Sequence, residues 1–206
     1  MVNTIQIVKR PGNNKEIAIG FSEGGWHAAE SLIVARYLMF TQVYGHKTRL
    51  AYNYHLQNAL KELLPDHVYP SPNTLEDYLK WDDWKVLGMI SSRQGGEHGA
   101  RILKRNHFRK VFQLSDVLTG KGAKKYDQVK QALKDMAQEI EDGKNWYKDD
   151  AEILIKESLS KETKKLSYFS NVVKNLKTPK TFYFYVDHEH VSIAEEKLKK
   201  LEKENV

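Results

Sequence analysis

The sequence predicts a mainly α-helical fold with a small β component. From Trp26 to about Leu64 there is no proline, and apolar residues recur at helical spacing, which is typical of a long helix. Residues 4–8 and 16–21 alternate apolar and polar side chains around the turn-forming segment KRPGNN, which predicts an N-terminal β-hairpin. The segment TFYFYV at residues 181–186 has the aromatic and β-branched composition of a strand.

The remaining elements follow from local signals. The long helical segment is one helix, or two helices that break near Gly45, because glycine is a poor helix former. Prolines after it predict a loop, and two glycines near residue 120 mark a boundary. We then expect helices at about residues 75–91 and 98–105, a short strand at 107–114, an amphipathic helix over 124–142 and a final helix at 192–205.

The composition limits the class of protein. The 206 residues are 40% hydrophobic and 29% charged, which is enough for a packed core in one domain with a small appendage. The absence of cysteine excludes disulfides, thiolate metal sites and a cysteine nucleophile. No apolar run approaches the roughly 18 residues of a membrane span, and the N-terminus lacks a signal-peptide pattern. We therefore expect a cytoplasmic protein without a membrane partner.

The charge distribution favours an anionic ligand. The formal net charge is +6, which suits nucleotide phosphates or nucleic acid, although a basic solvated surface also explains it. All seven arginines lie at or before Arg109, and every later basic residue is lysine. Because arginine makes bidentate phosphate contacts, a phosphate site is expected in the first half of the chain.

Motifs for hydrolysis are missing. None of the eight histidines is followed by aspartate, and HExxH, GxSxG and P-loop patterns do not occur. His188 and His190 could ligate a metal from one face of a strand, but a polar turn explains them better. His27 and Glu30 share a helix face, where pairing with the helix dipole is the better explanation of Glu30.

One constellation does suggest binding. Arg36, Phe40 and Tyr44 lie at i, i+4 and i+8, along one helix face, and His46 and Lys47 follow directly. This combines phosphate donors with rings on which a base can stack. The alternative is that the charges are surface residues and the rings belong to the core.

The stretch LIVARYLMFTQVYGHKTRLAYNYHLQNAL resembles the segment that follows the catalytic core of HD-superfamily phosphohydrolases, especially deoxynucleoside-triphosphate triphosphohydrolases. LEDYLKWDDWKVLGMI and ARILKRNHFRKVF resemble the next two elements of that family. The resemblance covers about residues 1–115. It implies a helical HD-phosphohydrolase C-terminal region at residues 1–120, which includes the N-terminal hairpin, and leaves residues 121–206 as a small α+β tail.

The resemblance also implies roles for particular residues. Arg36 matches an arginine that contacts nucleotide phosphates, and Tyr44 matches a residue on the sugar and base side of that pocket. In regulated members, the positions of His46 and Lys47 help to form a second nucleotide site at the subunit interface. A basic segment contributes to that second site, and it corresponds here to Arg105 and Arg109.

The family's catalytic metal is held by a His…His-Asp…Asp set that this sequence lacks. A divalent metal is therefore expected only in a missing HD core, and the chain resembles the C-terminal half of such an enzyme. The sequence predicts a non-catalytic or accessory protein that binds nucleotide phosphates, a partner hydrolase subunit, or both. The partner is an HD-core subunit or a second copy, which would cover the apolar face of the long helix. Trp81 and Trp84 could serve as a similar contact surface, although a partly buried core position is the commoner role of tryptophan.

Two other functions remain open. The chain could be a fragment or split half of an active metal-dependent nucleotide phosphohydrolase, which inspection of the neighbouring reading frame would test. It could instead be a basic nucleic-acid-binding module, whose affinity would fall steeply with salt.

Overall fold

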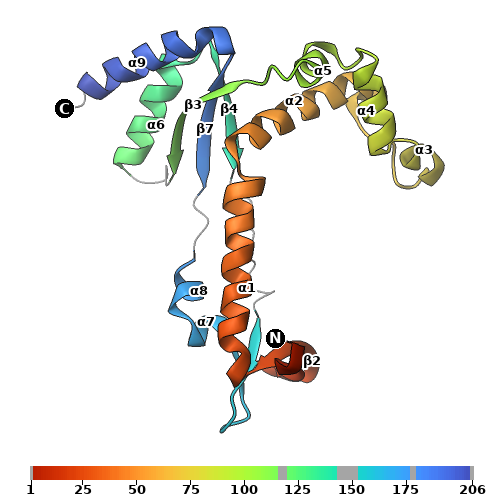
Figure 1. Ribbon diagram of the computed structural model, residues 1–206, viewed down its shortest axis with the longest axis vertical. Coiled ribbons are helices and arrows are strands. Elements are labelled where there is room, and N and C mark those ends of the chain that lie inside the picture. Colours follow the sequence, from red (N-terminus) through yellow and green to blue (C-terminus); the bar gives the residue numbers. More distant parts are fainter. Residues whose placement is uncertain (1, 116–119, 143–152, 177–179, 205–206) are drawn as a thin grey trace. The chain divides into compact units, whose positions relative to one another are not determined.

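The computed structural model describes residues 2–115, 120–142, 153–176 and 180–204 (Figure 1). The chain divides into two units, each made of two separate segments. Unit 1 comprises Met1–Tyr44 and Gly143–Pro179, and unit 2 comprises Gly45–Asp142 and Lys180–Val206. The boundary expected at residue 120 therefore falls inside unit 2. Helices predominate over strands, which confirms the predicted fold class.

Unit 1 is a small sheet covered by helices. The expected hairpin is present, and a later segment adds a parallel strand beside its second strand, so that the sheet order is β1-β2-β5-β6. Phe21, Ala29, Ile33, Ile155 and Leu166 form most of its buried core. The elements are β1 (Ile5–Arg10), β2 (Asn13–Ser22), α1 (Trp26–Leu38), a π-helical turn (Met39–Tyr44), β5 (Leu154–Lys156), β6 (Thr163–Lys165), α7 (Leu166–Phe169) and α8 (Asn171–Asn175).

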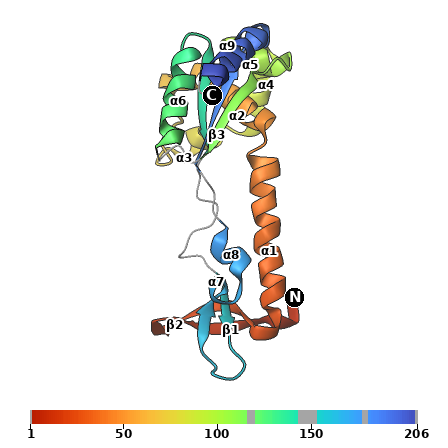
Figure 2. The same ribbon diagram turned by 90° about the vertical axis from the view of Figure 1, so that its left-hand side faces the viewer.

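Unit 2 contains a three-stranded sheet of order β3-β7-β4, in which the central β7 is antiparallel to both neighbours. Figures 1 and 2 show α6 and α9 together on one face of this sheet. Helix α5 packs against α2. The elements are α2 (Lys47–Leu63), α3 (Leu75–Leu79), α4 (Asp83–Ser91), α5 (Gly96–Leu103), β3 (Arg109–Ser115), α6 (Lys121–Ala132), β4 (Ala137–Asp142), β7 (Thr181–Val186) and α9 (Val191–Glu204).

Successive side chains of β7 point to opposite faces of its sheet, and the two faces differ in composition. Phe182, Phe184 and Val186 belong to the apolar core under α6 and α9. The intervening Tyr183 and Tyr185 lie on the other face. The Tyr185 hydroxyl donates a hydrogen bond to the backbone carbonyl of Lys47, at 2.8 Å, so the first residue of α2 is held over this second face.

Two expected helices are each interrupted. Helices α1 and α2 are separate, with Gly45 between them, which confirms the alternative of two helices. The helix expected over 75–91 is instead α3 and α4, because Asp82 between them caps α4 by accepting a 2.7 Å hydrogen bond from the Lys85 amide.

The helix expected over 124–142 is wrong beyond Ala132, where α6 ends. Residues 137–142 form β4 and pair with β7 along its whole length. The apolar stripe misled the prediction because Leu133 and Met136, in the connection, still contact the α6–α9 core. Ladder pairing with β7, a segment far away in the sequence, overrides the local helical period here.

Helix α2 is anchored by a buried histidine. Ala51, His55 and Ala59 form the buried stripe of α2. The Nε2 atom of His55 accepts a 3.2 Å hydrogen bond from the Phe108 amide, so its Nδ1 carries the proton. Nδ1 lies 2.8 Å from Nδ1 of His98 in α5 and donates to it. Burial lowers the pKa of His55 from 6.5 to about 4, with the nearby His98 adding to the effect.

Helix α5 approaches α2 through glycines. Gly95 has a positive φ of 82°, and a Cβ there would lie 3.3 Å from Cβ of Ala59. Farther along, Arg101 pairs with Glu97 at 2.9 Å and with Asp187, which caps the turn after β7. Helix α5 is thereby tied both to α2 and to the end of the central strand. Within the described residues, no helix is long and apolar enough to cross a membrane.

Substitution of Gly99 by alanine should destabilise unit 2, because the new Cβ would lie 2.3 Å from the backbone oxygen of Gln94. We expect a loss of about 1–3 kcal/mol, measured by urea unfolding. The matched control is Gly88→Ala at an exposed position of α4, where a Cβ meets nothing within 4 Å. That variant should gain up to about 1 kcal/mol. Equal effects of both changes would contradict the assigned packing.

The lowered pKa of His55 predicts acid sensitivity. Its stabilisation is present above pH 6.5 and is lost as the pH falls toward 4, because the unfolded histidine takes up a proton first. This loss amounts to roughly 3 kcal/mol at most. In His55→Gln, which is less stable at pH 7, urea unfolding between pH 7 and 4 should show a smaller decline. Carboxylate protonation affects both proteins, so parallel declines would refute the buried neutral state.

Candidate functional site

The predicted row of Arg36, Phe40 and Tyr44 lies in unit 1, at the end of α1 and in the π-helical turn that follows it. The guanidinium carbon of Arg36 lies 5.4 Å from the centre of the Phe40 ring. The Phe40 and Tyr44 rings follow with centroids 5.1 Å apart, tilted by 54°. Arg36 is exposed, and Tyr44 retains 41% of its accessible surface. A cation and two rings therefore lie along one strip that solvent reaches.

The next two predicted residues begin α2 in unit 2. His46 is the N-cap residue, and its Nδ1 accepts a hydrogen bond from the Thr48 amide at 3.3 Å. This bond fixes the proton of the neutral ring on Nε2, which leaves that N–H as a donor. Lys47 follows and is exposed. Its side chain carries a positive charge at the positive end of the helix dipole, where cations are disfavoured.

Lys110 is a site residue that the sequence analysis missed. It lies on β3, and its ammonium group is 5.9 Å from the centre of the Tyr183 ring and donates to the Gln113 side chain. Burial, and then the charge of Lys47, lower the pKa of Lys110. In the described ranges, no carboxylate forms an ion pair with Lys47 or Lys110.

Phenol groups lie beside this lysine pair. Burial raises the pKa of Tyr185, and its neighbours Tyr183 and Asp142 raise it further. Burial likewise raises the pKa of Tyr183. Both phenols thus stay protonated at neutral pH. The signal that could have indicated Lys110 was its place in the basic run Arg-Lys at the start of a strand whose neighbour alternates phenylalanine with tyrosine.

The two predicted arginines differ in their surroundings. Arg109 is half-buried, and one guanidinium nitrogen lies 2.7 Å from Nε2 of His107. His107 Nδ1 donates to the Phe108 carbonyl at 2.8 Å, so Nε2 is free to accept from Arg109. Arg105 is exposed in the turn after α5, with a positive φ of 55°. The structure gives no contact that joins Arg105 to the other predicted residues.

The residues considered as metal ligands do not come together in a metal site among the described residues. His188 and His190 belong to a short 3-10 turn capped by Asp187, so they are not on a strand. Glu30 accepts a hydrogen bond from the Ser170 hydroxyl within unit 1. Nowhere among the described residues do three or more histidine, aspartate or glutamate side chains gather as a metal site would require.

Comparisons with known proteins identify a family and similar solved structures. The family described as "HD associated region" matches residues 13–186. A hypothetical protein from Aquifex aeolicus has a similar structure, with a TM-score of 0.71 and 25% identity over 87% of this chain and 47% of that one. A phosphohydrolase from Bacteroides thetaiotaomicron VPI-5482 has a TM-score of 0.56 and 20% identity over 82% of this chain and 52% of its own. No curated protein matches.

The chain thus spans about half the length of each of these structures. The phosphohydrolase, at 20% identity, shares the fold with this chain. The family match covers most of the sequence and the larger part of both units. The chain belongs to the family of HD-associated regions.

Proposed function

We propose that this chain is an accessory, non-catalytic part of an HD-type phosphohydrolase, and that it binds nucleotide phosphates for an HD-core partner subunit. The observation that carries the proposal is the lysine pair of unit 2. Lys47 and Lys110 are close enough for one charge to lower the pKa of the other, and neither has a carboxylate partner among the described residues.

Two neighbouring like charges are costly unless an anion joins them. A phosphate group would accept hydrogen bonds from both ammonium groups and remove their mutual repulsion. His46 adds a ring N–H at the same end of α2. The Tyr183 and Tyr185 phenols remain uncharged, so they add no repulsion toward the anion.

The strip in unit 1 supports the nucleotide part of the proposal. An arginine fork suits a phosphate, and Phe40 and Tyr44 provide ring faces for a base. Arg36 and Tyr44 are the residues to which the family resemblance gives these roles. Arg105 and Arg109 stay in the proposal as further phosphate contacts, with Arg109 already oriented by His107.

A second candidate is that the chain is one half of an active metal-dependent phosphohydrolase. Its similarity to about half of the Bacteroides phosphohydrolase favours this reading. In both candidates the metal and the attacking water would belong to an HD core outside the described residues. An adjacent reading frame that carries the His…His-Asp…Asp set would favour the split enzyme.

Removal of the lysine pair should weaken nucleotide binding. Titration calorimetry with dATP is expected to give an affinity at least about tenfold lower for Lys47→Ala/Lys110→Ala, because each lost charged hydrogen bond contributes about 1.5–3 kcal/mol. Lys80→Ala, which breaks a surface pair with Asp77, should bind like the unaltered protein. Unchanged affinity in the double variant would overturn the site.

Substitution of Arg36 tests the strip in unit 1 separately. In the Lys47→Ala/Lys110→Ala background, Arg36→Ala should abolish the remaining rise in melting temperature that dATP produces, since a ligand stabilises only the state it binds. Lys9→Ala, an exposed change in the same unit, should leave that rise intact. If the affinity instead falls with salt at a slope corresponding to six or more phosphates, the chain is a nucleic-acid-binding module.

A further inference from the structure

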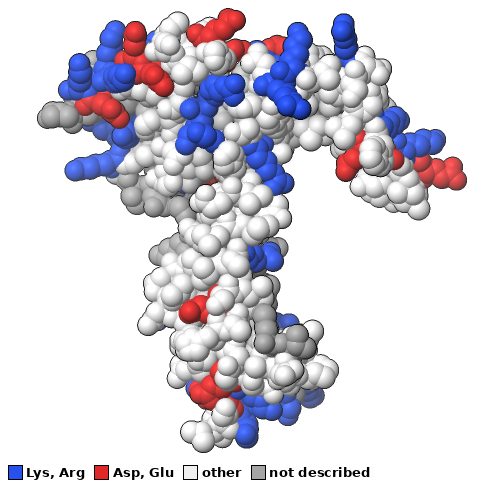
Figure 3. Space-filling model, in the orientation of Figure 1, with Lys and Arg blue, Asp and Glu red and all other residues white. Residues whose placement is uncertain are grey.

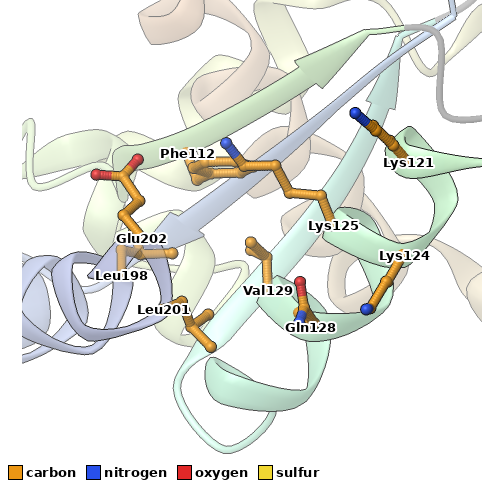
Figure 4. A pocket seen from close by; sticks show the side chains of 9 residues that line it. All are labelled: Phe112, Lys121, Lys124, Lys125, Gln128, Val129, Leu198, Leu201 and Glu202. Carbon is orange, nitrogen blue, oxygen red and sulfur yellow. The ribbon is translucent and has the colours of Figure 1, made fainter. Parts of the chain in front are cut away.

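A pocket lies between α6 and α9 of unit 2, at the side of β3 (Figure 4). Its volume is about 390 Å³. Buried Val129 and Leu198 and the half-buried Phe112 ring supply apolar walls. This volume and this apolar lining are within the range of pockets that hold small organic molecules.

Lysines border the pocket on one side. Lys121, Lys124 and Lys125 occupy the first two turns of α6, and all three are exposed. No acidic residue lies in the first turn of this helix, and no side chain caps it. Three cations next to a helix N-terminus repel one another and the helix dipole. None of them forms an ion pair in the part of the chain that the structure describes.

Lys125 connects the charged rim with the apolar wall. Its ammonium group lies 5.4 Å from the centre of the Phe112 ring, a cation–π distance. Figure 4 shows its side chain extending toward Phe112, with Lys121 and Lys124 nearer the start of α6. A molecule that enters between the helices therefore meets an aromatic face and an ammonium group together.

The opposite wall carries one acid. Glu202 of α9 lies across the pocket from Lys125, as Figure 4 shows. The lining residues thus combine three positive charges with one negative charge. On the face drawn in Figure 3, lysines and arginines gather over the α6 and α9 region, with acidic residues among them. Net positive charge in the pocket favours an anion, while Glu202 disfavours it.

We infer that this pocket binds a small organic anion with an apolar body, such as a nucleoside monophosphate or a medium-chain carboxylate. The anionic group contacts the lysines of α6, and the apolar body rests against Phe112 and Leu198. The inference is independent of the proposed function. The pocket uses the Phe184 face of the sheet, whereas the Lys47 and Lys110 pair lies on the tyrosine face.

The test is calorimetric titration of the full chain with AMP, decanoate and inorganic phosphate. All titrations use the Arg36→Ala/Lys47→Ala/Lys110→Ala background, so that neither the lysine pair nor the strip of the proposed function contributes. AMP or decanoate should bind at least about tenfold more tightly than inorganic phosphate, because only they bury apolar surface. Tight AMP binding identifies a nucleoside phosphate, and tight decanoate binding identifies an acyl carboxylate. Binding of neither at millimolar concentration overturns the inference.

Three variants in that background assign the binding to the pocket. Lys124→Gln/Lys125→Gln should weaken it at least about tenfold. Glu202→Gln should strengthen it about two- to threefold, because it removes a like charge. Lys199→Gln/Lys200→Gln removes the same charge from exposed positions of α9 outside the pocket and should have little effect. If both lysine double variants bind equally, or if Glu202→Gln weakens binding, the inference is wrong.

Discussion

The arrangement of unit 2 depends on the hydrogen bonds of one buried side chain. His55 accepts from the Phe108 amide, just before β3, and donates to His98 of α5. Together these two bonds require the neutral ring with its proton on Nδ1. A buried acceptor without its donor would cost about 1–3 kcal/mol, so α2, α5 and the entry to β3 are fixed as a set.

This set determines where the candidate phosphate site forms. With α2 fixed along its middle, Tyr185 holds the carbonyl of Lys47 at its start. Lys110 lies near the beginning of β3, a few residues after the Phe108 amide that His55 accepts from. The lysine pair is consequently positioned by backbone contacts, while both ammonium groups remain available for a ligand. The same sheet offers its opposite face to α6 and α9 and their separate pocket.

Local sequence patterns predicted most of the elements of this chain but not their partners. The hairpin follows from alternation, the strand at 181–186 from its aromatic and β-branched composition, and the break near Gly45, one of two alternatives, from glycine. All three are present. The strand at 137–142 could not be predicted, because its pairing with β7 bridges a long intervening segment. Lys110 was missed for the same reason, since its neighbour Lys47 lies far away in the sequence. The nucleotide roles of Arg36 and Tyr44 stay predictions.

The interleaving of the two units has a consequence for biosynthesis. Strand β2 receives its second neighbour, β5, only after the chain has passed through most of unit 2. The central strand β7 of unit 2, in turn, comes after the second segment of unit 1. A ribosome therefore releases neither unit in a complete form before the other is nearly made. Until residues 154–186 have been made, both nascent sheets keep unpaired edges, the condition under which growing chains associate wrongly or recruit chaperones.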